Sequence, residues 1–235
     1  MTDLGFERAR TPEAKRARQE KILAAAARLA TAGSVREVTA SAIADEVGMH
    51  KSAMLRYFET REDIFLRLAG DAWTEWSTVV RAELDALTTR PGPPIRPDRD
   101  RPSHEVAAVL AHSLVSRPLF CDLLAHTPLN LERNVSMERV KEFKTVALAE
   151  VAAIGSALCT VTPLLLDEAR AVVATATSMA AAMWQMAAPG THLRAFYESE
   201  PALAHAVVDV EPQLTDILGA LITGYAARQT RPEPN

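Results

Sequence analysis

Apolar residues recur at three- and four-residue spacing along most of this 235-residue chain, and this pattern decides its class of fold. Such spacing places the apolar side chains on one face of an α-helix, where they can be buried together. The chain has no alternating apolar and polar segment long enough for a half-buried strand. The sequence therefore predicts an all-α fold.

Caps and breakers divide the first part of the chain into four predicted helices. Thr11, followed by Pro12, is typical of a helix start, and Gly33 suits a helix end that requires positive φ. Thr39 is the predicted cap of the second helix. A capping box from Thr60 to Asp63 opens a longer helix. The four predicted helices span residues 11–33, 39–48, 50–57 and 60–87.

A proline-rich stretch separates these helices from the rest of the chain. Residues 88–102 contain five prolines and several charges, which favours a loop rather than a helix or a strand. Helical periodicity then returns, and its breaks at proline and glycine predict five further helices. They span about 103–116, 118–125, 135–159, 163–188 and 212–227.

Charge is distributed unevenly, although the whole chain has a net charge of only −4. Residues 1–70 carry 12 Lys and Arg against 10 Asp and Glu, whereas residues 71–235 carry 14 against 20. Only the first part of the chain is therefore suited to an anionic partner. Cys121 and Cys159 stand singly in apolar runs, which favours reduced core cysteines of a cytoplasmic protein. We expect neither an export signal nor a membrane span.

The segment around Gly48 has the pattern of a helix-turn-helix. Two short predicted helices meet at this glycine, and they lie in the basic part of the chain. Met54 and Phe58 are four residues apart, so both can pack against the core. Lys51 and its neighbours are then free to face outward, where a helix of this width fits the major groove of DNA.

Residues 38–65, VTASAIADEVGMHKSAMLRYFETREDIF, resemble the start of the TetR family of bacterial transcriptional regulators. The matching positions are Thr39, Ile43, Ala44, Gly48, Lys51, Phe58, Arg61, Glu62 and Ile64. The stretch RPLFCDLLAHTPLNLERNVSMERVKEFK is more loosely similar to the ligand-binding and dimerisation domain of one subgroup of that family.

The resemblance implies a set of DNA contacts. Residues of the reading helix would approach base edges, and residues at the starts of the flanking helices would hold phosphate. This sequence departs from the family pattern at His50, which replaces a better N-cap, and at Leu55, which replaces a tyrosine. The predicted DNA-binding residues are Thr39, Ser41, His50, Lys51, Ser52, Ala53, Leu55, Arg56, Tyr57 and Arg61.

The resemblance also implies a pocket for a small apolar or amphipathic effector in the larger domain. Large side chains and histidines on its predicted apolar faces are the candidates, although each one taken alone is more typical of a bundle core than of a ligand site. The predicted ligand-binding residues are Trp73, Trp76, His112, Phe120, His126, Phe143, Met179, Met183 and Trp184. His104 and Glu105 begin like a zinc motif, but residue 108 is alanine, so we expect no metal and no cofactor.

The sequence thus predicts a ligand-released transcriptional repressor that binds a palindromic DNA operator as a homodimer, with helices at about 163–188 and 212–227 as the interface. One alternative is a DNA-binding regulator without a pocket, whose larger domain only dimerises or recruits a protein. An enzyme, such as a hydrolase using His104, Glu105 and His112, is disfavoured because no nucleophile–base pair is present. The expected units are a flexible arm (1–10), a helix-turn-helix domain (11–59), a connecting helix (60–87), a loop (88–102), an effector-binding and dimerisation domain (103–228) and a disordered tail (229–235).

Overall fold

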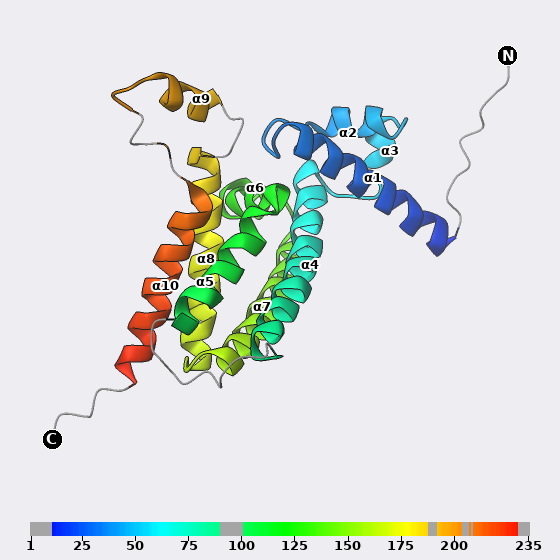
Figure 1. Ribbon diagram of the computed structural model, residues 1–235. Helices are drawn as coiled ribbons and strands as arrows, with labels where there is room; N and C mark the ends of the chain where they lie inside the picture. Colours follow the sequence, from blue (N-terminus) through cyan, green and yellow to red (C-terminus); the bar gives the residue numbers. More distant parts are fainter. Residues whose placement is uncertain (1–10, 90–100, 188–191, 204–206, 208, 230–235) are drawn as a thin grey trace, which may run out of the picture.

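The computed structural model describes residues 11–89, 101–187, 192–203, 207 and 209–229, and all regular structure in these ranges is helical. This confirms the predicted all-α class. A small unit of three helices leads through the long helix α4 into a bundle of the remaining helices (Figure 1). The elements are α1 (Pro12–Ala32), α2 (Ala40–Glu46), α3 (Lys51–Met54), α4 (Arg61–Thr89), α5 (Arg101–Val115), α6 (Pro118–His126), the π-helical segment η1 (Thr127–Leu131), α7 (Met137–Val161), α8 (Leu166–Ala187), α9 (His192–Ser199) and α10 (Val210–Arg228).

The predicted caps of the small unit form as the sequence indicates. The hydroxyl groups of Thr11 and Thr39 accept hydrogen bonds from the backbone N–H groups of Ala14 and Ala42, at 3.2 and 3.1 Å. Each bond satisfies one of the backbone donors that a helix start leaves unpaired. The predicted positive φ at Gly33 is wrong, since its φ is −133°. Among the described residues, Gly48 is the glycine with positive φ.

The bundle is built from pairs of helices that lie side by side. α4 packs along α7, α5 along α10, and α6 along α8. The chain turns by 85° between α5 and α6, at the predicted Arg117-Pro118 break, because proline cannot continue a helix. Trp76 is fully buried on α4 and donates a hydrogen bond from Nε1 to the hydroxyl of Ser113 on α5, at 2.9 Å. This bond satisfies the one polar atom of the indole ring.

The structure differs from the predicted elements in three places. α3 has only four residues, because the N–H groups of Arg56 and Tyr57 make bonds of the tighter i to i+3 type. The predicted turn after α6 is partly a π-helical segment, in which the N–H of Glu132 donates to the carbonyl of Thr127. α9 lies in the connection between the last two predicted helices, where no further helix was predicted. The predicted arm, most of the predicted loop and most of the predicted tail lie outside the described residues.

α7 is long and apolar enough to cross a membrane by length and composition alone, which the sequence analysis did not anticipate. One such helix is weak evidence for a membrane protein, because core helices of globular proteins have the same composition. Phe143, Ala147, Ile154 and Leu158 on this helix are buried in the bundle, although only 22% of its most apolar window is buried. Cys121 is buried as predicted, and burial, with the neighbouring Asp122 carboxylate, raises the pKa of its thiol to about 12. Cys159 is only partly buried.

Candidate DNA interface and effector cavity

The turn between α2 and α3 depends on Gly48. Its φ is 64°, a left-handed conformation that costs other residues free energy because their Cβ atom approaches the following carbonyl oxygen. The N–H of Gly48 donates to the carbonyl of Asp45, and the N–H of Met49 donates to the carbonyl of Ala44 at 2.8 Å. These bonds end α2 and aim the chain into α3.

One side of α3 packs against the core, and the opposite side faces solvent. Met54 and Phe58 are buried in the core of the small unit, as predicted. Lys51, Ser52 and Arg56 are exposed on the opposite side. The helix therefore presents a basic and polar surface, which is what a reading helix needs to approach a polyanion.

The other predicted contact residues surround this surface. Thr39 and Ser41 are exposed at the start of α2, and His50 and Leu55 are exposed at the two ends of α3. His50 makes no side-chain cap hydrogen bond, which agrees with its being a poor N-cap. Ala53 and Tyr57 are partly buried, and the backbone carbonyl of Tyr57 accepts a hydrogen bond from Gln19 of α1 at 3.4 Å.

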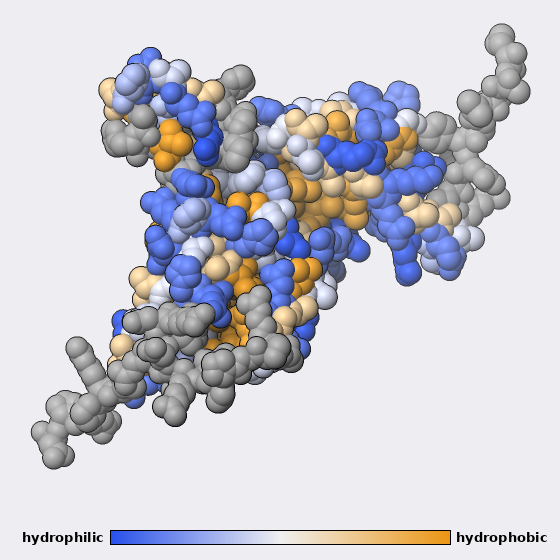
Figure 2. All heavy atoms as spheres, in the orientation of Figure 1, coloured by the Kyte–Doolittle hydropathy of each residue, from blue (hydrophilic) through white to orange (hydrophobic). Residues whose placement is uncertain are grey.

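A groove of about 540 Å³ brings several of these residues together. It is lined by Thr39, Lys51, Leu55 and Arg61 from the predicted set, and by Arg36, which the sequence analysis missed. Arg36 is exposed just before the cap of α2, so its place near the start of a helix in the basic part of the chain was the available signal. The outer edge of the α1–α3 unit is largely hydrophilic (Figure 2).

Arg61 lies differently from the prediction. Its guanidinium donates hydrogen bonds to the backbone carbonyls of Val35 and Val38, and it pairs with Glu62 at 3.0 Å. It also lies over the ring of Phe65, and its side chain is only 14% exposed. The predicted phosphate contact therefore needs a correction: in this structure the Arg61 fork is occupied by the loop between α1 and α2.

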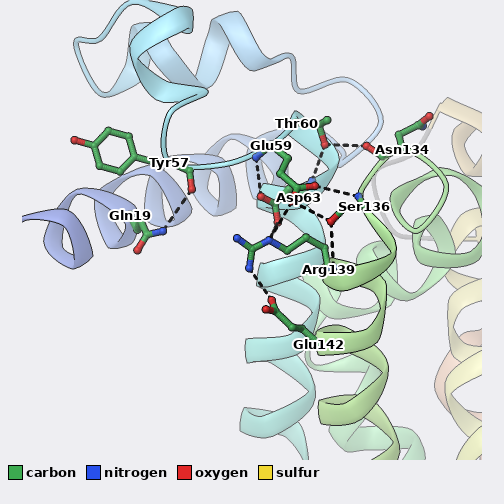
Figure 3. Close-up of polar contacts among 9 residues, drawn as sticks. All are labelled: Gln19, Tyr57, Glu59, Thr60, Asp63, Asn134, Ser136, Arg139 and Glu142. Carbon is green, nitrogen blue, oxygen red and sulfur yellow. Dashed lines mark hydrogen bonds and ion pairs between the residues drawn. The ribbon is translucent and has the colours of Figure 1, made fainter. Parts of the chain in front are cut away.

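Polar contacts join the elbow between α3 and α4 to the start of α7 (Figure 3). The Glu59 carboxylate accepts hydrogen bonds from the backbone N–H and the hydroxyl of Ser136, at 3.0 and 2.9 Å. These two bonds lower the pKa of Glu59 below its ordinary value. The hydroxyl of Thr60 donates to the carbonyl of Asn134 at 3.1 Å. The reading unit is therefore attached to α7 through hydrogen bonds as well as through α4.

Asp63 is the buried member of the same cluster. Burial raises the pKa of its carboxyl, and the hydrogen bond from the Glu59 backbone N–H and the charge of Arg139 oppose that change. Arg139 lies 3.6 Å from both Glu59 and Asp63 and pairs with Glu142 at 2.6 Å. The cluster lies at one end of a groove of about 400 Å³ between α4 and α7, which the sequence analysis did not anticipate.

A second cavity, of about 270 Å³, lies among α4, α6, η1, α7 and α8. Most of its lining is apolar, and the ion pair between Lys144 and Glu132, at 2.6 Å, lies on its wall. Such a lining suits an apolar molecule that carries a polar end. The lining residues are Trp73, Leu124, Thr127, Pro128, Glu132, Phe143, Lys144, Ala147, Leu148, Val151, Ala174, Thr177 and Ser178.

Of the nine predicted ligand residues, Trp73 and Phe143 line this cavity. Trp76 and Phe120 pack edge-to-face against Trp73, with ring centroids 5.5 Å from its ring, and do not line the cavity themselves. His126 is buried, with Nε2 3.4 Å from Asp122 and with Nδ1 lacking a hydrogen-bond partner in the described part of the chain. Of the remaining four, Met179, Met183 and Trp184 are buried or partly buried on α8 without lining the cavity.

His112 does not belong to the interior at all. Its side chain is 65% exposed, and Nδ1 lies 3.0 Å from the carboxylate of Glu211 on α10. The prediction placed it on an apolar face because its neighbours in the sequence are apolar. A helical residue one position away from the buried stripe points about 100° away from it, which explains the error.

Two family models together match most of the chain. Residues 22–68 match the family model of bacterial regulatory proteins of the tetR family, and residues 71–229 match the model described as tetracyclin repressor-like, C-terminal domain. No curated protein matches the chain.

Three solved structures of similar fold are distant from this chain in sequence. The fatty acid degradation regulator FadR from Bacillus halodurans is 12% identical, with a TM-score of 0.52 over 92% of this chain and 98% of that chain. The transcriptional regulator FadR from Bacillus subtilis, solved in complex with stearoyl-CoA, is 14% identical, with a TM-score of 0.53 over 87% and 98%. A TetR-family regulator from Mesorhizobium loti is 12% identical, with a TM-score of 0.51 over 91% and 97%. At these identities the likeness concerns the fold.

Proposed function

Because the chain belongs to the TetR family of DNA-binding transcriptional regulators, we propose that it is a repressor that binds a palindromic operator as a homodimer and is released by a small effector. The matched families and the similar folds are those of regulators, not of enzymes. A regulator of this kind acts where the chromosome lies, so we place it in the cytoplasm.

The observation that carries the proposal is the two-sided character of α3. Met54 is fully buried, whereas Lys51 and Ser52 are exposed at the start of the same helix. In a helix-turn-helix, this end of the reading helix meets base edges. We assign base contacts to Lys51, Ser52, Ala53 and Leu55, and backbone contacts to Thr39, Ser41, His50, Arg56 and Tyr57. Arg61 takes a supporting role instead.

Operator binding tests this assignment directly. A random DNA pool selected on the purified protein supplies the operator, and titrations at several salt concentrations then give the affinity and its salt slope. Lys51→Ala is expected to weaken binding by about 1–3 kcal/mol per half-site and to reduce the salt slope by about 1 for each lysine lost. Lys141→Ala, which removes an exposed lysine of α7, serves as the control. Unchanged affinity and slope in Lys51→Ala would remove α3 as the reading helix.

The proposed dimer uses α8 and α10. Small residues are exposed on both helices: Ala182 on α8, and Ala220, Gly224 and Ala227 on α10. Small side chains let two helices approach closely, as a four-helix interface across a two-fold axis requires. Two reading helices then have to lie about 34–36 Å apart to enter successive major grooves.

Light scattering tests the dimer. The wild-type protein is expected to be dimeric at micromolar concentration, and Gly224→Arg is expected to be monomeric. A Cβ atom at Gly224 meets nothing within 4 Å in the protomer, so this change acts on the interface rather than on the fold. Ala24→Arg, at an exposed position of α1, is the matched control. A dimeric Gly224→Arg would move the interface elsewhere.

The proposed effector site is the 270 Å³ cavity beside Trp73. Ligand pockets in proteins range from about 300 to 1,000 Å³, so a compact apolar molecule fits with little widening. The complex of the Bacillus subtilis FadR with stearoyl-CoA makes acyl chains reasonable probes, although a long chain requires the cavity to open. Fatty acids and acyl-CoA esters of increasing length are expected to lower operator affinity. If no apolar compound does so, the larger domain serves only for dimerisation or for recruiting a protein.

A further inference from the structure

Asp122 is a buried carboxylate that joins three separate elements. It lies on α6, and its Oδ2 atom accepts a hydrogen bond from the backbone N–H of Val35 at 2.6 Å. Its Oδ1 atom accepts a hydrogen bond from the side-chain amide of Gln185 on α8 at 2.7 Å and lies 3.4 Å from Nε2 of His126. A carboxylate is buried in this way only when hydrogen bonds compensate for its lost hydration.

The bond to Val35 reaches the reading unit. Val35 lies in the loop between α1 and α2, with its side chain fully buried, and Thr39 at the end of the same loop caps α2. The carbonyl of Val35 accepts from Arg61 of α4 while its N–H donates to Asp122. The loop is therefore held at one residue by two helices: α4 binds the carbonyl of that residue, and α6 binds its N–H group. A change in the position of α6 has a direct path to the start of α2.

The other contacts of Asp122 lead toward the effector cavity. α6 continues into η1, and Leu124, Thr127 and Pro128 of these two segments line the cavity. α8 supplies Gln185 to Asp122 and also supplies Thr177 to the cavity wall. π-helical segments such as η1 are rare and are frequently found at functional sites. α6 and α8 both border the cavity, and they are joined by the carboxylate that accepts a hydrogen bond from Val35.

We propose that Asp122 is a positioning residue that couples the effector cavity to the DNA-reading unit, by transmitting the placement of α6 and α8 to the backbone of Val35. The inference rests on the proposed function for its biological meaning, but the coupling itself is a property of the fold. A cavity occupant that displaces Thr127 or Thr177 would shift the carboxylate, weaken its bond to Val35 and release the loop that caps α2. An effector can change DNA affinity only through such a difference between two states.

Hydrogen exchange at the Val35 amide measures the coupling without any effector. Gln185→Leu is the decisive variant, because Gln185 is exposed, lies on α8 and reaches the reading unit through Asp122. Residues on a coupling path change a distant equilibrium by factors of about 2–30, so the exchange rate at Val35 is expected to rise in that range. Gln213→Leu, which removes an exposed glutamine of α10, is expected to leave the rate unchanged.

A rescue variant distinguishes positioning from simple packing. Asp122→Leu removes both acceptors and is expected to raise the exchange rate more than Gln185→Leu does. In the double variant Asp122→Asn/Gln185→Glu, the new amide donates to the new carboxylate while its oxygen still accepts from Val35, so slow exchange is expected to return. The proposal is overturned if Gln185→Leu exchanges like the wild type, or if the double variant exchanges as fast as Asp122→Leu.

Operator binding by the same variants separates this inference from the proposed function. Gln185→Leu is expected to weaken operator binding although the residue lies outside the DNA interface, and the double variant is expected to restore it. Wild-type protein that selects no DNA sequence from the pool would refute the proposed function, while the exchange rates at Val35 would still decide whether Asp122 couples the two parts of the fold. Wild-type operator affinity in Gln185→Leu, with DNA binding established, would refute the coupling.

Discussion

The guanidinium of Arg61 donates to the backbone carbonyl of Val35, a residue whose N–H group is held by a different helix. This contact makes the first residue of α4 a support for the loop before α2. A planar guanidinium can bind two carbonyls at once, here those of Val35 and Val38, and an ammonium group cannot reproduce that geometry. The stability of the reading unit should therefore depend on Arg61.

Arg61→Ala is expected to lower the free energy of unfolding by about 2–3 kcal/mol, because two carbonyls lose their donor. Arg61→Lys is expected to recover less than half of that loss. Urea denaturation measures both changes. Arg56→Ala, at an exposed position, should change stability by less than about 0.5 kcal/mol. A salt slope of operator binding that falls in Arg61→Ala as much as in Arg56→Ala would return Arg61 to the phosphate contacts.

The positive φ of Gly48 predicts that alanine lowers the stability of the protein at this position, unlike alanine at a glycine inside a helix. Gly48→Ala is expected to cost about 1–2 kcal/mol, which is the penalty of the left-handed conformation for a residue with a Cβ atom. The cost is conformational, since a Cβ atom there meets nothing within 4 Å. Gly48→Asn should cost less, because asparagine tolerates this conformation better. Chemical denaturation of the two variants gives the comparison.

Gly70→Ala is the control, and its expected effect on stability has the opposite sign. Gly70 lies inside α4, where an added Cβ atom meets the Phe143 ring at an ordinary 3.9 Å. Alanine is there expected to stabilise the protein by about 0.5–1 kcal/mol. Equal effects at the two glycines would show that the turn does not depend on the conformation of Gly48.

Local signals predicted the helix starts, and long-range contacts account for the errors. Thr11 and Thr39 were identified correctly because a cap depends on residues three positions away. The role of Arg61 depends on carbonyls 23 and 26 residues earlier, which its place in a motif does not reveal. Asp122 was missed for the same reason, since Val35 and Gln185 are 87 and 63 residues away. A single acid within the apolar run PLFCDLLAH was the only trace of it in the sequence.

The candidate cavity was also predicted only in part: the sequence indicated which side chains lie in the bundle, but not which of them line the cavity. Periodicity placed Trp73 and Phe143 in the bundle, and both line the cavity. Periodicity could not distinguish them from Trp76 and Phe120, because a residue that lines a cavity and a residue packed behind it have the same sequence pattern. Which face of a buried aromatic ring meets open space is decided by the packing of several helices together.

Trp73 is expected to report an occupant of the cavity. A brominated fatty acid quenches indole fluorescence on contact, and Trp73 lines the cavity whereas Trp184 does not. Trp73→Phe should therefore remove most of the quenching seen in the wild type, and Trp184→Phe should retain it. A steady-state fluorescence titration decides between them. Quenching that disappears only in Trp184→Phe would place the occupant near the far end of α8.

The buried carboxylate of Asp122 predicts a pH dependence of stability. Burial alone would raise its pKa, but the hydrogen bonds from His126, Val35 and Gln185 bring the pKa below its ordinary value. A carboxyl whose pKa is lower in the folded state stabilises the protein above the unfolded pKa, and this contribution is lost as the pH falls through the folded pKa. The difference in unfolding free energy between the wild type and Asp122→Asn should therefore narrow as the pH falls below about 4.

Asp63 supplies the matched comparison, because burial raises its pKa in the folded state. Between the unfolded pKa and this raised value, the folded state binds more protons than the unfolded state, so lowering the pH favours folding. The difference in unfolding free energy between the wild type and Asp63→Asn should thus shift in favour of the wild type as the pH falls toward about 4. Urea denaturation at several pH values follows both pairs. Parallel slopes for the two pairs would mean that the hydrogen bonds from His126, Val35 and Gln185 do not hold Asp122 in its charged form.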